Sequence, residues 1–351
     1  MREIVQKAWR ETETAWRQLF NNSGSASPFQ SYGFLTFTGR GKPYRTDLFR
    51  LVGLKELNLI LYRDGEPIAV AALLFKKKKK RHMCYMRGHF TSANYLDFVY
   101  HRGLTYEDFR FLMDGIKDML GDVSFQFDRI PGEALTCQYM KLYFASDRIV
   151  PYECAYIPLT QSYDDWLQSL RKSVRQSMKN RCNRMERDRI EWSVDYFRGP
   201  SVDETAYRKA MLVCAERFLT RCPFHFGPLS KLAGQALAVL LLKEKLMQWI
   251  SRSEDSFTAI LYMNGEVAAF ANALICRGRL LSGVRFAISS KYAKYSPGGL
   301  LISSMVKYLI DQNQQGAGQI DLLDMGQGVS GGSTYKYSYG GVPCYQYYFM
   351  S

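Results

Sequence analysis

The sequence lacks the residue patterns that mark several common classes of protein. Its eight cysteines are scattered without a C-x-x-C pair and it has only four histidines, so we expect reduced thiols and no metal site. The first thirteen residues are too charged for a secretory signal. The longest apolar runs, Ile68–Phe75 and Ala236–Leu242, are too short to cross a bilayer. These absences predict a soluble, cytoplasmic protein.

Acidic side chains are also in short supply. The chain has 33 Asp and Glu against 47 Lys and Arg, which gives a formal net charge of +14 and a pI near 9.3. Such an excess implies an anionic partner, and a nucleotide, a nucleic acid, an anionic glycan or a membrane surface all fit. Apolar residues are plentiful, since 47% of the chain is hydrophobic, and 351 residues suffice for two folded domains.

One segment concentrates the positive charge. Residues 163–189 carry apolar side chains at helical spacing on one side, which predicts a long helix. Eight basic residues crowd residues 171–189 of this segment, against two acidic ones there, Glu186 and Asp188. Two interpretations remain open: a solvated helix face, or an anion-binding surface whose candidate residues are Arg175 and Lys179.

The chain contains an internal repeat. L-I-L-Y-R-D-G-E-P-I-A-V-A-A-L-L at 59–74 aligns with A-I-L-Y-M-N-G-E-V-A-A-F-A-N-A-L at 259–274, with eight of sixteen positions identical. Each copy predicts a β-hairpin, because alternating apolar residues flank an Asp-Gly or Asn-Gly turn. The length of the match indicates two tandem domains of one fold, which we place at residues 1–150 and 151–351.

Only the second copy of the hairpin is followed by the sequence S-P-G-G at residues 296–299. Ser296 suits an N-cap and Pro297 suits the first position of a helix, where no N–H is needed. Gly298 and Gly299 would then present unhindered N–H groups at the positive end of the helix dipole, where a phosphate or pyrophosphate binds well. The alternative interpretation is an ordinary capped helix without a ligand.

Several stretches in chain order resemble the GNAT acyltransferase superfamily in its tandem-domain form. The resemblance is closest to the CelD/BcsL-type acetyltransferases, which are relatives of the Fem aminoacyltransferases. The matching stretches are S-P-F-Q-S-Y-G-F-L (27–35), the hairpin turn with G-E-P-I-A-V-A-A-L (65–73), L-R-K-S-V-R-Q-S-M-K-N-R (170–181), the second hairpin (259–274), K-Y-S-P-G-G-L-L (294–301), I-D-L-L-D-M-G (320–326) and Y-K-Y-S-Y-G (335–340).

The resemblance implies an α/β (α+β) fold of two tandem GNAT-like domains, each a mixed, mostly antiparallel sheet flanked by helices. It also implies that two central strands separate to admit the pantetheine arm of acyl-CoA. The donor pyrophosphate would bind in the C-terminal domain, and the N-terminal domain would carry a degenerate donor site. The implied donor-binding residues are Ser296, Gly298, Gly299 and Leu300, and the family's aromatic–lysine pair corresponds to Tyr335 and Lys336.

Acyl transfer to an amine needs a base, donors for the oxyanion and an acid for the leaving thiolate. We expect Lys336 to stabilise the oxyanion or a donor phosphate, and Tyr335 or Tyr337 to protonate the thiolate. Asp324 is the candidate base, with Asp321 as the next candidate and as a residue that orients the acceptor. The remaining candidates are His225 on a loop between helices and Arg285 on the strand before S-P-G-G, which would bind an acidic group of the donor or pair with Glu266.

The leading function is thus the transfer of an acyl group from acyl-CoA, with acetyl-CoA as the first choice of donor. The acceptor would be an amino or hydroxyl group of a sugar, an amino acid or another small biosynthetic molecule. One alternative is a Fem-like enzyme that takes its acyl group from aminoacyl-tRNA, which would explain the basic segment. A second alternative is a non-catalytic binder of nucleic acid or anionic glycan on a GNAT scaffold. No metal is expected in any of these.

Overall fold

The structure is a computed structural model of the chain. It describes residues 1–23, 27–39, 53–89, 93–144, 148–220, 252–276, 279–316, 320–327 and 335–351. The chain divides into two compact units, an N-terminal unit (Met1–Cys154 with Cys344–Ser351) and a C-terminal unit (Ala155–Pro343). It passes from the first to the second within β7 (Arg148–Pro158) and returns within β13 (Val342–Met350). The predicted boundary at residue 150 falls in β7, whereas the return of the last strand was not predicted.

The N-terminal unit is a sheet with strand order β1-β2-β3-β4-β6-β13. Neighbouring strands are antiparallel, except that β4 and β6 run parallel and helix α4 connects them. The elements are β1 (Arg2–Gln6), α1 (Glu13–Asn22), α2 (Tyr32–Gly39), β2 (Lys55–Arg63), β3 (Glu66–Lys78), β4 (Arg81–Met86), β5 (Val99–Tyr100), α4 (Tyr106–Leu120), β6 (Val123–Pro131) and α5 (Leu135–Tyr143).

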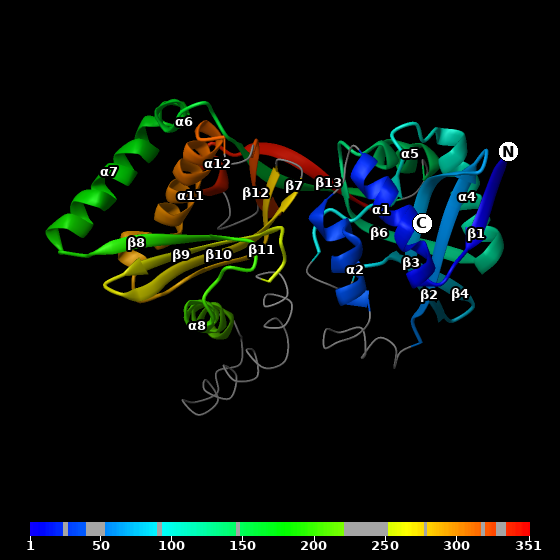
Figure 1. Cartoon of the computed structure of the whole chain (residues 1–351), viewed down its shortest axis with the longest axis horizontal. Helices are drawn as coiled ribbons and strands as arrows, with labels where there is room; N and C mark the ends of the chain where they lie inside the picture. Colours follow the sequence, from blue (N-terminus) through cyan, green and yellow to red (C-terminus); the bar gives the residue numbers. More distant parts are fainter. Residues whose placement is uncertain are drawn as a thin grey trace. The chain divides into compact units, whose positions relative to one another are not determined.

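The C-terminal unit repeats this plan with strand order β8-β9-β10-β11-β12, in which only β11 and β12 run parallel and α11 connects them. In Figure 1, α11 lies on one face of β8–β11 and α8 on the other. The elements are α6 (Tyr163–Ser169), α7 (Lys172–Arg187), β8 (Trp192–Arg198), α8 (Glu204–Thr220), β9 (Ser256–Met263), β10 (Glu266–Cys276), β11 (Arg279–Ile288), α11 (Pro297–Gln314), β12 (Leu322–Gln327) and α12 (Tyr335–Ser338).

The two hairpins that the sequence repeat predicts share both their turn and their register. Asp64 and Gly65 have φ of 54° and 85°, and Asn264 and Gly265 have 49° and 75°, as a two-residue type I′ turn requires. Each hairpin also has a β-bulge after the second residue pair from the turn. The extra residue is Ile68 in β3 and Ala268 in β10, which are 200 positions apart. The tandem arrangement and the mixed, mostly antiparallel fold class are therefore confirmed.

The core of the C-terminal unit forms where α11 packs on β9 and β10. β10 contributes small side chains, so the backbone of α11 can approach the sheet closely. The larger side chains of α11 fill the remaining space. The strand residues are Ala269, Ala271 and Ala273, and the helix residues are Leu301, Ile302, Met305, Val306 and Leu309. Among the described residues, no helix is long and apolar enough to cross a membrane.

The single helix predicted over 163–189 is wrong in one respect, because the segment forms two helices. α6 ends at Ser169, and Leu170 and Arg171 both have extended backbone before α7 begins. Leu170 is buried in the core of the unit, and this burial turns the chain there. The sequence also predicts a helix at about 229–250, and this segment lies outside the described residues.

Candidate functional site at the start of α11

The parallel strands β11 and β12 part soon after they meet. Their described pairing covers three residue pairs, from Arg279–Leu322 to Leu281–Asp324. β11 then continues to Ile288 paired with β10, with a register shift between Asn272 and Leu274, whereas β12 ends at Gln327. Where parallel strands part, backbone N–H and C=O groups become available to a side chain or a ligand. The separation that the resemblance implies is therefore present in this sheet.

Two predicted site residues lie at this separation. Lys336 is 6% exposed, and its Nζ donates to the carbonyl oxygens of Met325 at 2.5 Å and Gly326 at 3.0 Å. Asp324 is fully buried, and its Oδ1 accepts from the N–H of Gly326 at 2.6 Å. A buried ammonium held by two carbonyls is a positive charge in a fixed position, which suits it to stabilise a developing anion.

Among the described contacts, none joins another of the predicted site residues to Asp324 or Lys336. Tyr335 is 39% exposed at the start of α12. Asp321 is exposed, and its carbonyl oxygen accepts from Leu159 N at 2.9 Å, at the start of β12 rather than beside Asp324. The backbone of Arg285 lies opposite Asn272 in the β10–β11 register. His225 lies outside the described residues.

The start of α11 differs from the predicted cap. Ser296 stands at the N-cap position, but its φ of 50° and ψ of 57° are left-handed and its side chain caps no N–H. Its carbonyl oxygen accepts from both Gly299 N at 3.0 Å and Leu300 N at 3.2 Å. The N–H of Gly299 is thus engaged, and Gly298 supplies the first-turn N–H for which the described residues offer no acceptor.

Two residues that the site prediction missed lie against Gly299. Arg181, on α7, is 8% exposed, and its Nη2 donates to the hydroxyl of Tyr339 at 3.1 Å. A Cβ on Gly299 would lie 1.9 Å from that hydroxyl and 2.9 Å from Arg181 Nη2. Position 299 is therefore glycine because the two side chains occupy the space. The sequence signal was available, since Arg181 interrupts the apolar stripe of Val174, Met178 and Met185 at helical spacing.

The two predicted anion-binding residues of α7 have different environments. Arg175 is half-buried, and its Nη1 donates to the carbonyl oxygens of Gln168 at 2.7 Å and Leu170 at 2.8 Å. It thereby satisfies carbonyls left open where α6 ends. Lys179 is exposed. The geometry thus gives Arg175 a role in holding the break between the helices.

Arg175→Gln is expected to lower the free energy of unfolding by about 1 to 2 kcal/mol, because hydrogen bonds from a charged donor to two carbonyls are lost. The matched change Lys179→Gln, on the same helix and exposed, is expected to shift it by less than about 0.5 kcal/mol. Urea unfolding followed by fluorescence measures both. Equal stability of the two variants would contradict the capping role.

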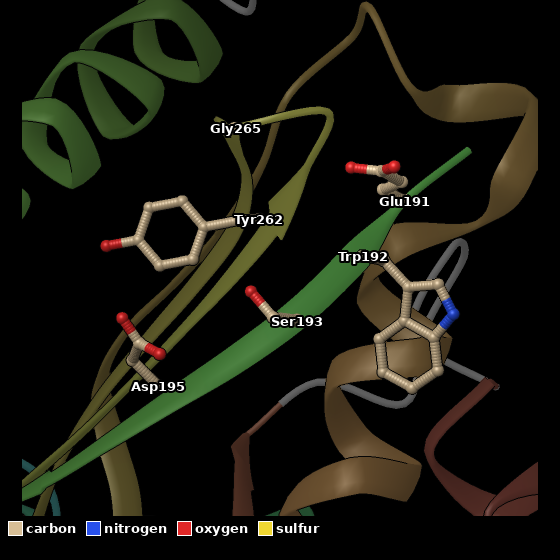
Figure 2. Close-up of a pocket in the computed structure, with 6 residues that line it drawn as sticks. All are labelled: Glu191, Trp192, Ser193, Asp195, Tyr262 and Gly265. Atoms are coloured by element: carbon tan, nitrogen blue, oxygen red, sulfur yellow. The ribbon is translucent and has the colours of Figure 1, made fainter. Parts of the chain in front are cut away.

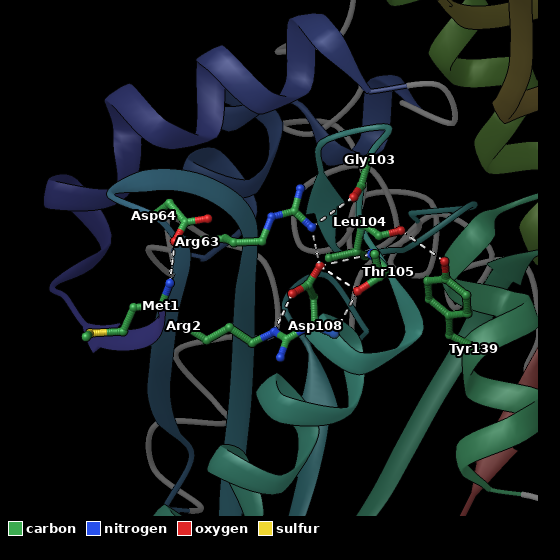
Figure 3. A network of polar contacts seen from close by, with 9 residues as sticks. All are labelled: Met1, Arg2, Arg63, Asp64, Gly103, Leu104, Thr105, Asp108 and Tyr139. Atoms are coloured by element: carbon green, nitrogen blue, oxygen red, sulfur yellow. Dashed lines mark hydrogen bonds and ion pairs between the residues drawn. The ribbon is translucent and has the colours of Figure 1, made fainter.

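The equivalent helix start in the N-terminal unit is closed by the protein itself, as Figure 3 shows. Asp108, the third residue of α4, accepts from Arg2 Nε at 2.6 Å and Arg63 Nη1 at 2.7 Å. Thr105 at the N-cap completes a capping box with it. Burial works to raise the pKa of Asp108, but the hydrogen bonds from Arg2 and Thr105 outweigh it and hold that pKa below its ordinary value. The carboxylate of Asp108 thus occupies this helix start, and the degenerate donor site expected in this unit stays a prediction.

A surface pocket of about 420 Å³ lies elsewhere, on edge strand β8. Figure 2 shows Ser193, Asp195 and Tyr262 on one side of the strand and Trp192 pointing away from them. The pocket is open to solvent and includes no residue of α11, β12 or α12. Its position gives it no connection with the buried ammonium of Lys336, so we place the candidate site at α11 and not here.

Comparison with known proteins gives a sequence family for part of the chain and solved structures of similar fold. Residues 172–337 match the sequence family described as an acetyltransferase (GNAT) domain. The sequence matches no curated protein significantly. FemX has a similar structure over 99% of this chain and 96% of its own, with 13% identity and a TM-score of 0.57. A tandem GNAT protein from the clavulanic acid biosynthesis pathway is similar over 100% and 98%, with 10% identity and a TM-score of 0.53.

Because these identities are low, the two structures support the fold alone. The family match applies to residues 172–337, which lie in the C-terminal repeat. Together with the repeated hairpin and the parting strands, they confirm the resemblance inferred from the sequence. Residues 172–337 match the GNAT acetyltransferase family, and the chain as a whole has a fold of two tandem GNAT-like domains that is similar to the fold of FemX.

Proposed function

We propose that this chain transfers an acyl group from acyl-CoA, with acetyl-CoA as the first choice, to an amino or hydroxyl group of a small biosynthetic acceptor. Acyl transfer in general follows from the family; the donor and the acceptor class are the proposal. The observation that carries it is the buried ammonium of Lys336, fixed by two carbonyls where β11 and β12 part. The donor phosphates would bind at the start of α11.

In the proposed reaction the acceptor nitrogen attacks the carbonyl carbon of the thioester, the C–S bond breaks, and CoA leaves as a thiolate. Lys336 stabilises the negative charge that develops on the carbonyl oxygen. Asp324 takes the proton that the amine loses, and Tyr335 donates one to the thiolate. Asp321 and Lys179 remain candidates for orienting the acceptor. Roles for His225 and Arg285 remain predictions from the sequence.

An aminoacyl-tRNA donor is the main alternative, and it depended on the basic segment 163–189. Three arginines of α7 have partners within the C-terminal unit. Arg175 and Arg184 donate to backbone carbonyls, and Arg187 pairs with Asp188. The carbonyl contacts fix two guanidinium groups within the unit and the ion pair offsets the charge of a third, so fewer basic groups are available to follow a tRNA backbone, which favours acyl-CoA.

Acetyl-CoA is expected to raise the Tm of the full chain, because a ligand that binds only the folded state adds about 2.7 kcal/mol of stability at a hundred times its Kd. Calorimetry at several salt concentrations should give a shallow dependence of log K on log salt, as a single small anion does. If acetyl-CoA does not bind and the affinity for charged tRNA falls steeply with salt, aminoacyl-tRNA would replace acyl-CoA as the proposed donor. Binding of nucleic acid or anionic glycan without turnover would contradict the enzyme itself.

A further inference from the structure

The two repeats begin their crossover helices differently at one position. In α4 the N-cap is Thr105 and the third helical residue is Asp108. In α11 the N-cap position is Ser296 and the third helical residue is Gly299. The N-terminal repeat thus carries a carboxylate at the place where the C-terminal repeat carries no side chain. Basic side chains lie near this place in both repeats.

In the N-terminal repeat the basic side chains and the helix end are neutralised from within the chain. Arg2 and Arg63 both contact the carboxylate of Asp108, which also accepts from Thr105 N at 3.1 Å. An anion at this place compensates both the guanidinium groups and the positive end of the helix dipole. In the N-terminal repeat, the basic side chains and the start of the helix are thus compensated by an anion.

In the C-terminal repeat the anion is missing. Arg181 is more than nine-tenths buried and its Nη2 lies 2.9 Å from where a Cβ of Gly299 would be. Within the described residues it forms no ion pair, and its one described hydrogen bond goes to the neutral hydroxyl of Tyr339. A buried guanidinium beside the positive end of an 18-residue helix is electrostatically unfavourable unless an anion joins them.

We propose that Arg181 binds a phosphate group of the donor, as Arg2 and Arg63 bind the Asp108 carboxylate in the other repeat. The ligand class is the diphosphate of acyl-CoA, so the inference rests on the proposed function and adds a residue from α7 to it. The Gly298 N–H and the Tyr339 hydroxyl proton, which has no acceptor among the described residues, would complete the set of donors.

Tyr339 is well placed to hold the guanidinium. Its carbonyl oxygen accepts from the indole N–H of Trp166 at 3.3 Å, and its side chain is 7% exposed. Gly340 follows with a φ of 82°, which a side chain would disfavour. The tyrosine is thus fixed at both ends, and the hydroxyl that accepts from Arg181 stays free to donate to a phosphate oxygen.

The first test compares Arg181→Gln with Arg187→Gln, a change of equal chemistry at a 74% exposed arginine of the same helix. Calorimetry with CoA, and separately with inorganic pyrophosphate, is expected to show affinity at least about tenfold weaker in Arg181→Gln and unchanged in Arg187→Gln. Equal CoA affinity in both variants would overturn the role of Arg181 while leaving the proposed function intact. Absence of CoA binding in the wild-type chain would instead defeat the proposed function.

Pyrophosphate separates these two failures further. If the wild-type chain binds pyrophosphate in an Arg181-dependent way but does not bind CoA, the phosphate site stands and its donor is another phosphate compound. If pyrophosphate binding does not depend on Arg181, the phosphate site is wrong. Arg181→Lys gives a graded check, since it keeps the charge but loses the planar fork, and intermediate affinity is expected.

The second test copies the N-terminal repeat into the C-terminal one. Gly299→Asp places a carboxylate beside Arg181, and Gly299→Asn places a side chain of the same size without the charge. Gly299→Asp is expected to abolish CoA binding and to melt above Gly299→Asn, because its carboxylate supplies the missing anion. Both variants displace Tyr339, so this steric effect cancels in the comparison. A lower Tm for Gly299→Asp than for Gly299→Asn would overturn the proposal.

Discussion

Lys336→Met is expected to lower turnover of acetyl-CoA at least about a hundredfold, because removing one donor to a developing oxyanion costs on the order of 10² to 10³ in rate. The ammonium of Lys336 is held by the carbonyls of Met325 and Gly326, so its position does not depend on substrate. Methionine keeps the length and packing of the side chain and removes the charge alone. Release of free thiol from acetyl-CoA, with and without a primary amine, measures the loss.

A control variant and a measurement of CoA affinity distinguish the possible roles of Lys336. Lys307→Met removes a lysine whose side chain is 56% exposed and paired with Asp311 on α11, and is expected to leave turnover unchanged. CoA affinity measured in Lys336→Met separates the two roles of the lysine: a loss of turnover alone indicates the oxyanion, and a loss of both indicates a donor phosphate. Wild-type turnover in Lys336→Met would exclude Lys336 from the reaction.

The sequence predicted those parts of the fold that short-range rules determine. The paired hairpins follow from Asp64-Gly65 and Asn264-Gly265, because few dipeptides tolerate two successive positive φ angles and a fixed register follows from the turn. Their repetition revealed the tandem arrangement without any structure. The parting of β11 and β12 came from the family resemblance, since no local pattern distinguishes strands that separate from strands that stay paired.

The details of the site needed the tertiary structure. Ser296 is a residue type that commonly caps helices. After the turn at residues 293–295, however, its backbone is left-handed and its side chain accepts no hydrogen bond from an N–H of α11. The role of Arg175 depends on the break after Ser169, which burial of Leu170 produces. Arg181 could have been singled out, because a basic residue within an apolar stripe must either be paired or bind something.

The N-terminal unit contains a carboxyl group that should make its stability depend on pH. Asp97 is 6% exposed; its Oδ1 accepts from Thr136 Oγ1 at 2.5 Å and from its neighbour Phe98 N at 2.7 Å. Burial raises the pKa of Asp97 to about 7 from its ordinary 3.8, these two hydrogen bonds oppose the rise, and the charge of Glu133 adds to it. In the unfolded chain the group ionises near pH 4, so stability falls as pH rises from about 4 to about 7, and the full cost remains above that.

Asp97→Asn is therefore expected to stabilise the protein above pH 7 by on the order of 4 kcal/mol, because the pKa of Asp97 is about 7 instead of 3.8 and one pKa unit corresponds to ~1.4 kcal/mol. The amide oxygen can still accept from Thr136, and the amide resembles the protonated carboxyl, so the two proteins should be equally stable at pH 4. Urea unfolding at pH 4, 6 and 8 measures the difference. Asp122→Asn, at a 59% exposed carboxylate, provides the control and should show no such divergence. Parallel stability curves for Asp97→Asn and the wild-type chain would mean that Asp97 is ionised in the folded state throughout this range, with its charge compensated by a group that the described contacts do not include.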